Sequence, residues 1–388
     1  MKSKRMKIKQ EQGITLIALV ITVVILIILA TVTLNVVLGE GGLIKRAQEG
    51  KELTDQAQKD EQDELKGAEE YINGVLAGTG TTNPPDEKSE VEEAKESGTP
   101  FEDTTTIKDD LDNPVTVPGG FNIAEDSGTK VEEGIVIEDS NNNQFVWIPV
   151  GEYNVSTTIN SSGKLTNELS RREWADRNVV AEPTPVNGDD VIDTDSYGEG
   201  NENSVAKEQI GAFKTSATTN KGFYIGRYEQ GEGNVCKSGI NPYTDITRDQ
   251  AKTQAEAMYG GNEFVTSELI SSYAWDTVLN FICQTNEEGY LLATTNDSTY
   301  GNINTGSSGK TQTGEYEADN YSNIHDLLGN CWEWTTEYSC DDGYPCVYRG
   351  GRYSSSILFA ASRNGTGSTS YSSTYCSFRL QLYINPKS

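Results

Sequence analysis

The chain has 388 residues and a formal net charge of −28 at pH 7, which disfavours nucleic-acid binding because phosphate contacts need clusters of lysine and arginine. Its one histidine, His325, excludes any single-chain metal site that needs two or three imidazoles. The charge is uneven: residues 1–42 carry +3, residues 43–118 carry −12 and residues 119–388 carry −19. We therefore expect three segments with different physical roles.

The N-terminal segment predicts a membrane anchor. A basic leader, residues 1–13, precedes an uncharged and mostly apolar run, residues 14–38. As a helix this run is roughly 37 Å long, and a bilayer core is about 30 Å thick. The positive-inside rule then predicts a single-pass protein of the cell membrane with its head outside the cell. A secretory signal peptide is the alternative, although its apolar region is usually about 7–15 residues long.

The residues around the start of this run resemble the processing site of type IV prepilins. The sequence from Lys9 to Leu19 reads KQEQGITLIAL, and the resemblance implies cleavage between Gly13 and Ile14 by a prepilin peptidase. The fifth mature position holds Ala18, where the family usually has a glutamate that is thought to pair with a neighbouring subunit in the filament. Association with other pilins in a pilus therefore stays open beside a plain single-span anchor.

Two polar segments follow the predicted anchor. Residues 39–76 are rich in Ala, Glu, Gln, Lys and Leu, and this composition predicts a mostly solvated helical stalk. Residues 77–118 are rich in Gly, Thr, Pro and acidic residues. Such a composition buries too little apolar surface to offset the entropy of ordering, which predicts an acidic disordered linker.

Residues 119–388 predict a loop-rich α+β head. Short apolar runs bounded by Asn, Gly and Ser predict strands, at 134–137, 145–150 and 223–228. Helical spacing of apolar residues predicts two helices, at 248–259 with Thr247 as its N-cap, and at 266–283.

Four blocks of the head resemble the formylglycine-generating-enzyme/sulfatase-modifying-factor family, in the family's order. They are Gly222–Glu229 (GFYIGRYE), Ile324–Trp334 (IHDLLGNCWEW), Arg349–Tyr353 (RGGRY) and Ser377–Arg379 (SFR). The resemblance covers most of residues 119–388 and implies a C-type-lectin-like fold.

The motif residues are expected to support this fold. Trp332 and Trp334 alternate with Glu333, which would place both indoles on one face of a strand. The glycines permit turns, and Arg349 can serve buried carbonyls or a carboxylate. The structural motif set comprises Asn330, Trp332, Glu333, Trp334, Arg349, Gly350, Gly351, Phe378 and Arg379.

The catalytic members of this family use a pair of C-terminal cysteines that hold copper, or three histidines that hold iron. The end of this chain has Cys376 alone in place of the pair, and only one histidine, so we expect no catalytic residue and no enzymatic activity. Cys340 and Cys346 are close enough in sequence for a local disulfide, or for two unpaired loop cysteines. No cofactor is predicted, and calcium binding by acidic side chains is left unassigned.

Residues 338–380 have an anomalous composition. They are dense in Ser, Tyr, Gly and Thr and contain no Lys, Glu, Gln, Met or Trp. These five amino acids are the ones excluded when both adenines of an asparagine codon ending in a pyrimidine are randomised. The stretch therefore resembles the variable region of diversity-generating-retroelement target proteins, whose 3′ ends are rewritten by an error-prone reverse transcriptase.

Tyrosine, serine, glycine and asparagine also favour recognition, because they combine broad contact area with adaptable hydrogen bonds. The alternative is that these loops are ordinary polar surface. The predicted variable, ligand-binding residues are Cys340, Asp341, Asp342, Gly343, Tyr344, Tyr348, Arg352, Ser354, Ser355, Ser356, Leu358, Phe359, Asn364, Thr366, Ser368, Tyr371, Ser372, Ser373 and Tyr375.

These features together predict a membrane- or pilus-anchored surface protein whose head binds an extracellular protein or glycan through diversified loops. Two other functions stay open. One is an exported oxidoreductase that keeps the activity of the formylglycine-generating-enzyme family. The other is a structural minor pilin that binds no foreign ligand.

Overall fold

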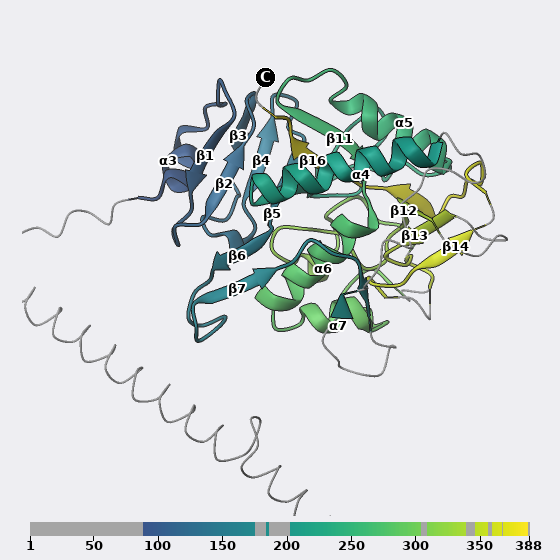
Figure 1. Ribbon diagram of the computed structural model, residues 1–388. Helices are drawn as coiled ribbons and strands as arrows, with labels where there is room; N and C mark the ends of the chain where they lie inside the picture. The colour runs from purple at the N-terminus through teal and green to yellow at the C-terminus, as the bar shows by residue number, and fades with distance from the viewer. Residues whose placement is uncertain are drawn as a thin grey trace, which may run out of the picture. The chain divides into compact units, whose positions relative to one another are not determined.

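The largest element of the head is a six-stranded antiparallel sheet with strand order β11-β16-β10-β5-β4-β3 (Figure 1). The computed structural model describes residues 88–174, 184–185, 202–303, 309–338, 346–355, 359–366 and 368–386. The strands of the sheet are β3 (Phe121–Ile123), β4 (Val136–Asp139), β5 (Gln144–Pro149), β10 (Gly222–Gly226), β11 (Val265–Leu269) and β16 (Leu380–Ile384). Strands β4, β5 and β10 confirm the three predicted strands.

A second sheet has four strands in the order β14-β13-β12-β15. They are β12 (Trp332–Tyr338), β13 (Cys346–Arg349), β14 (Asn364–Thr366) and β15 (Cys376–Phe378). Strands β12 and β15 pair in parallel, with Trp332 opposite Cys376. Only Arg379 separates β15 from β16, so the chain passes directly from the small sheet into the large one.

Three two-stranded ladders, five α-helices and two 3₁₀ helices, Val131–Glu133 and Glu317–Asp319, complete the described fold. The ladders pair β1 (Thr105–Lys108) with β2 (Pro114–Val117), β6 (Gly151–Asn154) with β7 (Lys164–Asn167), and β8 (Arg172–Glu173) with β9 (Thr184–Pro185). The helices are α3 (Glu90–Ser97), α4 (Glu202–Thr219), α5 (Arg248–Met258), α6 (Ser272–Thr285) and α7 (Gly289–Thr294). The head is thus a mixed α and β unit in which strands predominate.

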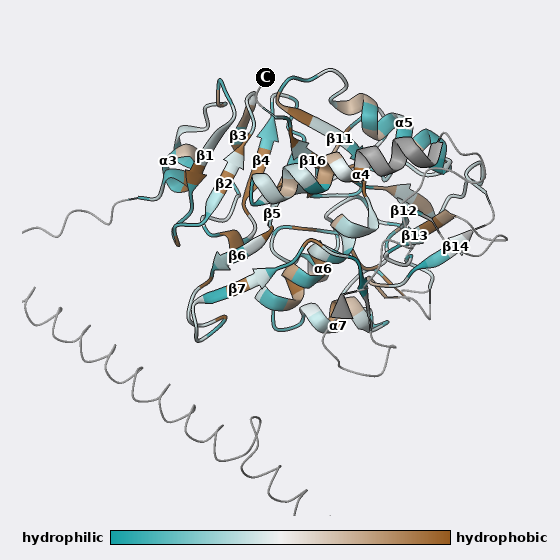
Figure 2. Cartoon of the chain, viewed as in Figure 1, coloured by the Kyte–Doolittle hydropathy of each residue, from teal (hydrophilic) through white to brown (hydrophobic). Residues whose placement is uncertain are grey.

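Helix α4 packs on the large sheet through an aromatic contact. The ring of Phe213 lies 5.1 Å from that of Phe223 on β10 and 5.9 Å from that of Tyr383 on β16. The Ser216 hydroxyl donates to the carbonyl of Ile384 at 2.6 Å. Apolar residues recur along the strands and on α6, whereas α3 is mostly hydrophilic (Figure 2).

Helix α5 begins where the sequence predicts. The Thr247 hydroxyl accepts from the backbone N–H of Gln250 at 3.2 Å, and the Gln250 side chain accepts from the backbone N–H of Thr247 at 3.0 Å. This reciprocal pair satisfies two N–H groups at the start of the helix.

The second predicted helix, 266–283, is wrong in its first part. Residues Val265–Leu269 form β11, and all five pair with β16. The helix begins only at Ser272, because the Ser271 hydroxyl accepts from the N–H of Ala274 at 3.2 Å and caps it there. The helical apolar spacing seen from Trp275 onward did not extend back through the strand.

The prediction of a disordered linker over residues 77–118 is wrong for residues 88–118. Helix α3 and the β1-β2 ladder lie in this range and belong to the same compact unit as the head. Val91, Ile107, Val115 and Val117 are buried there, while the acidic residues of α3 remain at the surface. A few well-spaced valines and isoleucines are enough to order a segment that is polar on average.

Two turns share one hydrogen-bonding design. In the β4-β5 turn, Oδ1 of Asp139 accepts from the backbone N–H groups of Asn141 and Asn143, and Oδ2 accepts from the Asn143 side chain. The turn between β1 and β2 repeats these bonds from Asp109 to Leu111 and Asn113. Both turns hold their carboxylates in place with local donors.

The predicted membrane span, residues 14–38, lies outside the described residues, as do the leader and the stalk. Among the residues that are described, no helix is long and apolar enough to cross a membrane.

Candidate functional site

Aromatic side chains gather where the loops of the four-stranded sheet meet. The ring of Trp332 stacks on that of Tyr348, with centroids 4.4 Å apart and planes 23° apart. The ring of Tyr353 lies 5.7 Å from that of Tyr375. We call Trp332, Tyr348, Tyr353 and Tyr375 the aromatic platform.

Arg352 joins the two halves of this platform. Its guanidinium carbon lies 4.6 Å from the ring centroid of Trp332 and 4.0 Å from that of Tyr375. Both distances suit attraction between a cation and the negative face of an aromatic ring.

The structure describes most of the predicted variable residues. Ser354, Tyr371 and Ser372 are exposed. The half-buried members are Arg352, Phe359, Asn364, Ser368, Ser373 and Tyr375. Tyr348 and Ser355 are buried, so both lie below the surface rather than on it. Thr366 belongs to β14, and the members outside the described residues are Cys340, Asp341, Asp342, Gly343, Tyr344, Ser356 and Leu358.

We call the exposed and half-buried members, together with Trp332 and Tyr353 of the aromatic platform, the loop face. The segments that carry the loop face follow β13, include β14 or precede β15. These three strands belong to one four-stranded sheet. Tyr371 also reaches the ring of Trp334, 6.3 Å away. Loops distant in sequence are thus presented by a common scaffold.

A buried network of ion pairs fixes the base of these loops. On β13, Arg349 donates to Asp276 of α6 at 2.7 Å and to the carbonyls of Ala361 and Ser362 at 3.1 Å. Arg363 bonds the same aspartate and Glu337, at 2.7 Å for the latter. The side chains of Arg349 and Asp276 are fully buried.

The electrostatics of Asp276 follow from this network. Burial alone would raise the pKa of its carboxyl, but Arg349 and Arg363 outweigh burial and lower that pKa. Asp276 is therefore an ion inside the protein, and its partners hold α6 against the segment that leads into the variable loops.

A second buried group centres on Arg379. It donates to both oxygens of Glu333, at 2.7 Å and 3.0 Å. Nearby, Glu229 accepts from the Asn330 side chain at 2.6 Å and from the Cys331 backbone at 2.9 Å. All these residues are buried, as are the remaining motif residues Trp334, Gly350, Gly351 and Phe378.

Sequence reasoning placed Trp332 in the structural motif, but this residue is half-buried and belongs to the aromatic platform. Tyr353 was missed as a contact residue. The available signal was its position directly after Arg352, in a stretch where tyrosine recurs.

Two groups of the head, a thiol and an imidazole, have strongly shifted pKa values. Cys376 is buried, and burial raises the pKa of its thiol to about 12. His325 stacks on Tyr228 at 5.0 Å, and burial, with help from Arg227 and Arg379, lowers its pKa to about 3. Both groups are therefore neutral near pH 7. Cys346 is a free, buried cysteine, and its predicted partner Cys340 lies outside the described residues.

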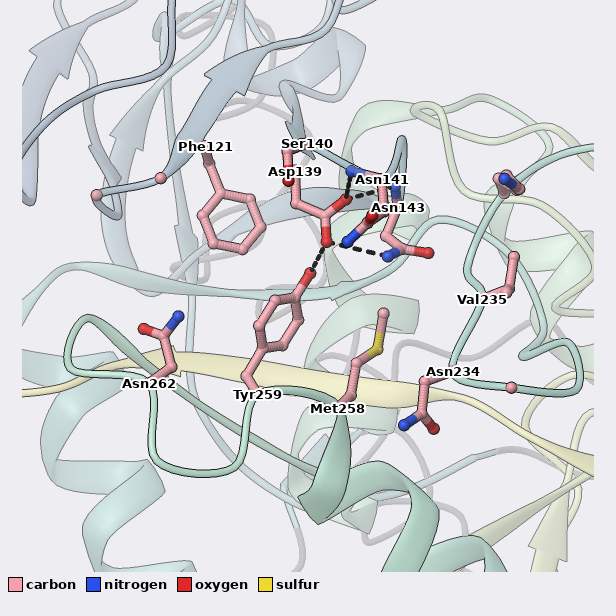
Figure 3. A pocket seen from close by; sticks show the side chains of 14 residues that line it. Phe121, Asp139, Ser140, Asn141, Asn143, Asn234, Val235, Met258, Tyr259 and Asn262 are labelled. Carbon is pink, nitrogen blue, oxygen red and sulfur yellow. Dashed lines mark hydrogen bonds between the residues drawn. The ribbon is translucent and has the colours of Figure 1, made fainter.

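A separate pocket of about 750 Å³ lies beside the β4-β5 turn (Figure 3). Phe121, Met258 and Tyr259 line it together with several asparagines. Its only carboxylate, Asp139, already accepts four hydrogen bonds, including one from the Tyr259 hydroxyl at 2.8 Å. None of the predicted site residues lines this pocket.

No protein-family model and no curated protein matches the chain. Among solved structures, the chain is similar to CarF at 14% identity, over 43% of this chain and 87% of that one, with a TM-score of 0.33. It is also similar to Treponema denticola variable protein 1 at 10% identity, over 62% of this chain and 95% of that one, with a TM-score of 0.31. Similarity at these TM-scores assigns neither a family nor a fold.

Proposed function

We propose that the chain is a surface-displayed, membrane- or pilus-anchored protein whose C-type-lectin-like head binds an extracellular protein or glycan through the loop face. One observation carries the proposal. The described residues of the anomalous stretch separate into exposed or half-buried loop positions and a buried scaffold that is held by ion pairs. Such a division lets side chains on the loops change while the fold stays constant.

The ion pairs of the scaffold residues set them apart from the loop residues. Within residues 338–380, Arg349 and Arg379 are fully buried and paired with carboxylates that lie outside the stretch, at Asp276 and Glu333. By contrast, Ser354, Tyr371 and Ser372 are exposed. The composition of the exposed set, rich in tyrosine and serine, suits adaptable recognition.

We propose binding rather than catalysis for this head. Burial keeps Cys376 and His325 uncharged near neutral pH, so neither supplies a thiolate nor a cationic acid. Anchoring and prepilin-type processing at Gly13 and Ile14 rest on the N-terminal sequence, and the head is proposed to lie outside the cell.

The division between loops and scaffold can be tested with two display libraries of the full-length chain. The first randomises Ser354, Asn364, Ser368, Tyr371 and Ser372, and the second randomises Asn330, Glu333, Trp334, Arg349 and Gly350. We expect most members of the first library to resist proteolysis like the parent, and few members of the second to do so, because only the second disrupts buried contacts. Equal loss of resistance in both libraries would contradict a loop face built for variation.

The genetic part of the proposal predicts two features in the gene's neighbourhood. One is a reverse-transcriptase gene, and the other is a near-copy of the 3′ end that differs mainly at adenines. Sequencing the flanking DNA checks both. If neither feature is present, the stretch is not a retroelement target, even if the face binds a ligand.

A further inference from the structure

The four arginines of residues 338–380 are not equivalent. Arg349, Arg363 and Arg379 each pair with a carboxylate, drawn from Asp276, Glu337 and Glu333. Arg352 makes no ion pair and no hydrogen bond from its side chain with any residue that the structure describes. It is therefore the one guanidinium of the stretch left without a carboxylate in the described part of the head.

The aromatic platform holds Arg352 in place without neutralising it. The guanidinium lies against Trp332 and Tyr375, and Trp332 is itself stacked on the buried ring of Tyr348. Aromatic faces attract a cation but accept no strong hydrogen bond, so the guanidinium keeps its donors. A side chain already oriented in this way loses less conformational entropy when a ligand binds.

Two donors at this place lack acceptors. Nε of Arg352 and the indole Nε1 of Trp332 are buried and have no hydrogen-bond partner. Neither group can act as an acceptor. A buried donor without a partner is unfavourable, so a small rearrangement that brings an acceptor to these two atoms is favoured.

We propose that the loop face recognises its ligand through a carboxylate, which docks on Arg352 beside Trp332 and Tyr375. A carboxylate offers planar, paired acceptors that match the guanidinium fork, and its single charge matches a single arginine. The inference rests on the proposed binding function and names the ligand group at its centre.

The test uses NMR of the ¹⁵N-labelled full-length protein in detergent. The Nε–H resonance of Arg352 is identified by its loss in the Arg352→Lys variant. Sodium acetate is then titrated as the carboxylate probe, acetamide as its neutral isostere, and inorganic phosphate as the other oxyanion. We expect a saturable shift of this resonance with acetate, none with acetamide, and weaker binding of phosphate than of acetate.

Three variants sharpen the test. Arg352→Gln should abolish acetate-dependent shifts at the Tyr353 and Tyr375 backbone amides without changing the unfolding midpoint. Trp332→Phe keeps the ring but removes the indole donor, and should weaken acetate by about threefold to tenfold. The control Lys237→Gln removes a lysine of the separate pocket and should leave acetate binding unchanged.

An absent or non-saturable acetate shift, an equal response to acetamide, or tighter binding of phosphate would overturn the carboxylate assignment. These outcomes are measured on the parent protein, and only the assignment of the resonance needs the conservative Arg352→Lys variant. They are also independent of the display libraries. If the acetate titration fails and the libraries behave as expected, only the carboxylate assignment is wrong. If the titration succeeds and the libraries fail, the head has an anion site but no loop face built for variation.

Discussion

Replacing Asp276 with asparagine is expected to lower the free energy of unfolding by about 3–5 kcal/mol, the cost of removing one member of a buried ion pair. The Asp276 carboxylate accepts from the side chains of Arg349 and Trp174, at 2.7 Å and 3.1 Å, and from the backbone of Arg172 at 2.9 Å. Its replacement leaves the fully buried Arg349 with less compensating charge. Urea unfolding followed by circular dichroism measures the effect.

The matched control is Asp112→Asn. This aspartate pairs with Lys108, but both side chains are largely exposed, at 77% and 62%. Solvent screens such an exposed pair, so it contributes little to the free energy of unfolding. If Asp276→Asn were no more destabilising than Asp112→Asn, the buried network would not be what fixes the base of the loops.

Replacing Asp326 with asparagine is expected to have the opposite sign and to stabilise the head at pH 7.5. Burial raises the pKa of Asp326 to about 6, even though the Gly314 N–H and Arg379 act to lower it. Burial also raises the pKa values of Glu229, Asp319 and Glu333 around the same arginine. One guanidinium thus faces four carboxyl groups.

The pH dependence follows from the direction of the shift. A carboxyl whose pKa is higher in the folded state than in the unfolded state binds its proton more tightly when folded. The free energy of unfolding therefore falls as pH rises from about 4 to about 6, and stays low above that interval. The head should be more stable at pH 5 than at pH 7.5 as far as this cluster is concerned.

Asparagine removes the charge and keeps the local geometry. Asp326 has a φ of 61°, a left-handed conformation that asparagine tolerates well, and its Oδ2 accepts from Gly314, as an amide oxygen also can. Because the pKa rises from 3.8 to about 6, removing the charge corresponds to a gain on the order of 3 kcal/mol at pH 7.5 and about half of that at pH 5. Thermal unfolding at both pH values checks this, with the exposed Glu93→Gln as control. Destabilisation at pH 7.5 would show that the ionised carboxylate is needed.

Local sequence signals predicted the elements whose causes are local. Helix α5 was predicted with its Thr247 cap because the capping residues lie three positions apart. Strand β5 was found because its apolar run is continuous. Strand β11 was missed because pairing with β16, more than a hundred residues away in sequence, decides its conformation.

The same distinction between local and long-range causes applies to the residues of the candidate site. Composition pointed to residues 338–380 and to Arg349 as support for them. The sequence also placed Arg352 among the variable residues and Arg349 and Arg379 in the structural motif. It did not identify the carboxylates that pair with the buried arginines, because these come from α6 and β12 and are seen only in three dimensions. Nor did it indicate that Tyr348 would be buried beneath Trp332.

Strand β16 comes directly after the anomalous stretch, and this position affects which products of the gene can fold. This strand pairs on both sides, with β10 and β11, and it follows the whole anomalous stretch. A frameshift within residues 338–380 removes it and separates β11 from the rest of the large sheet. If the loop codons are rewritten as proposed, chains that lack β16 would fold poorly and be degraded by proteases before they could be displayed. Amino-acid changes on the loop face leave β16 intact and escape that quality control.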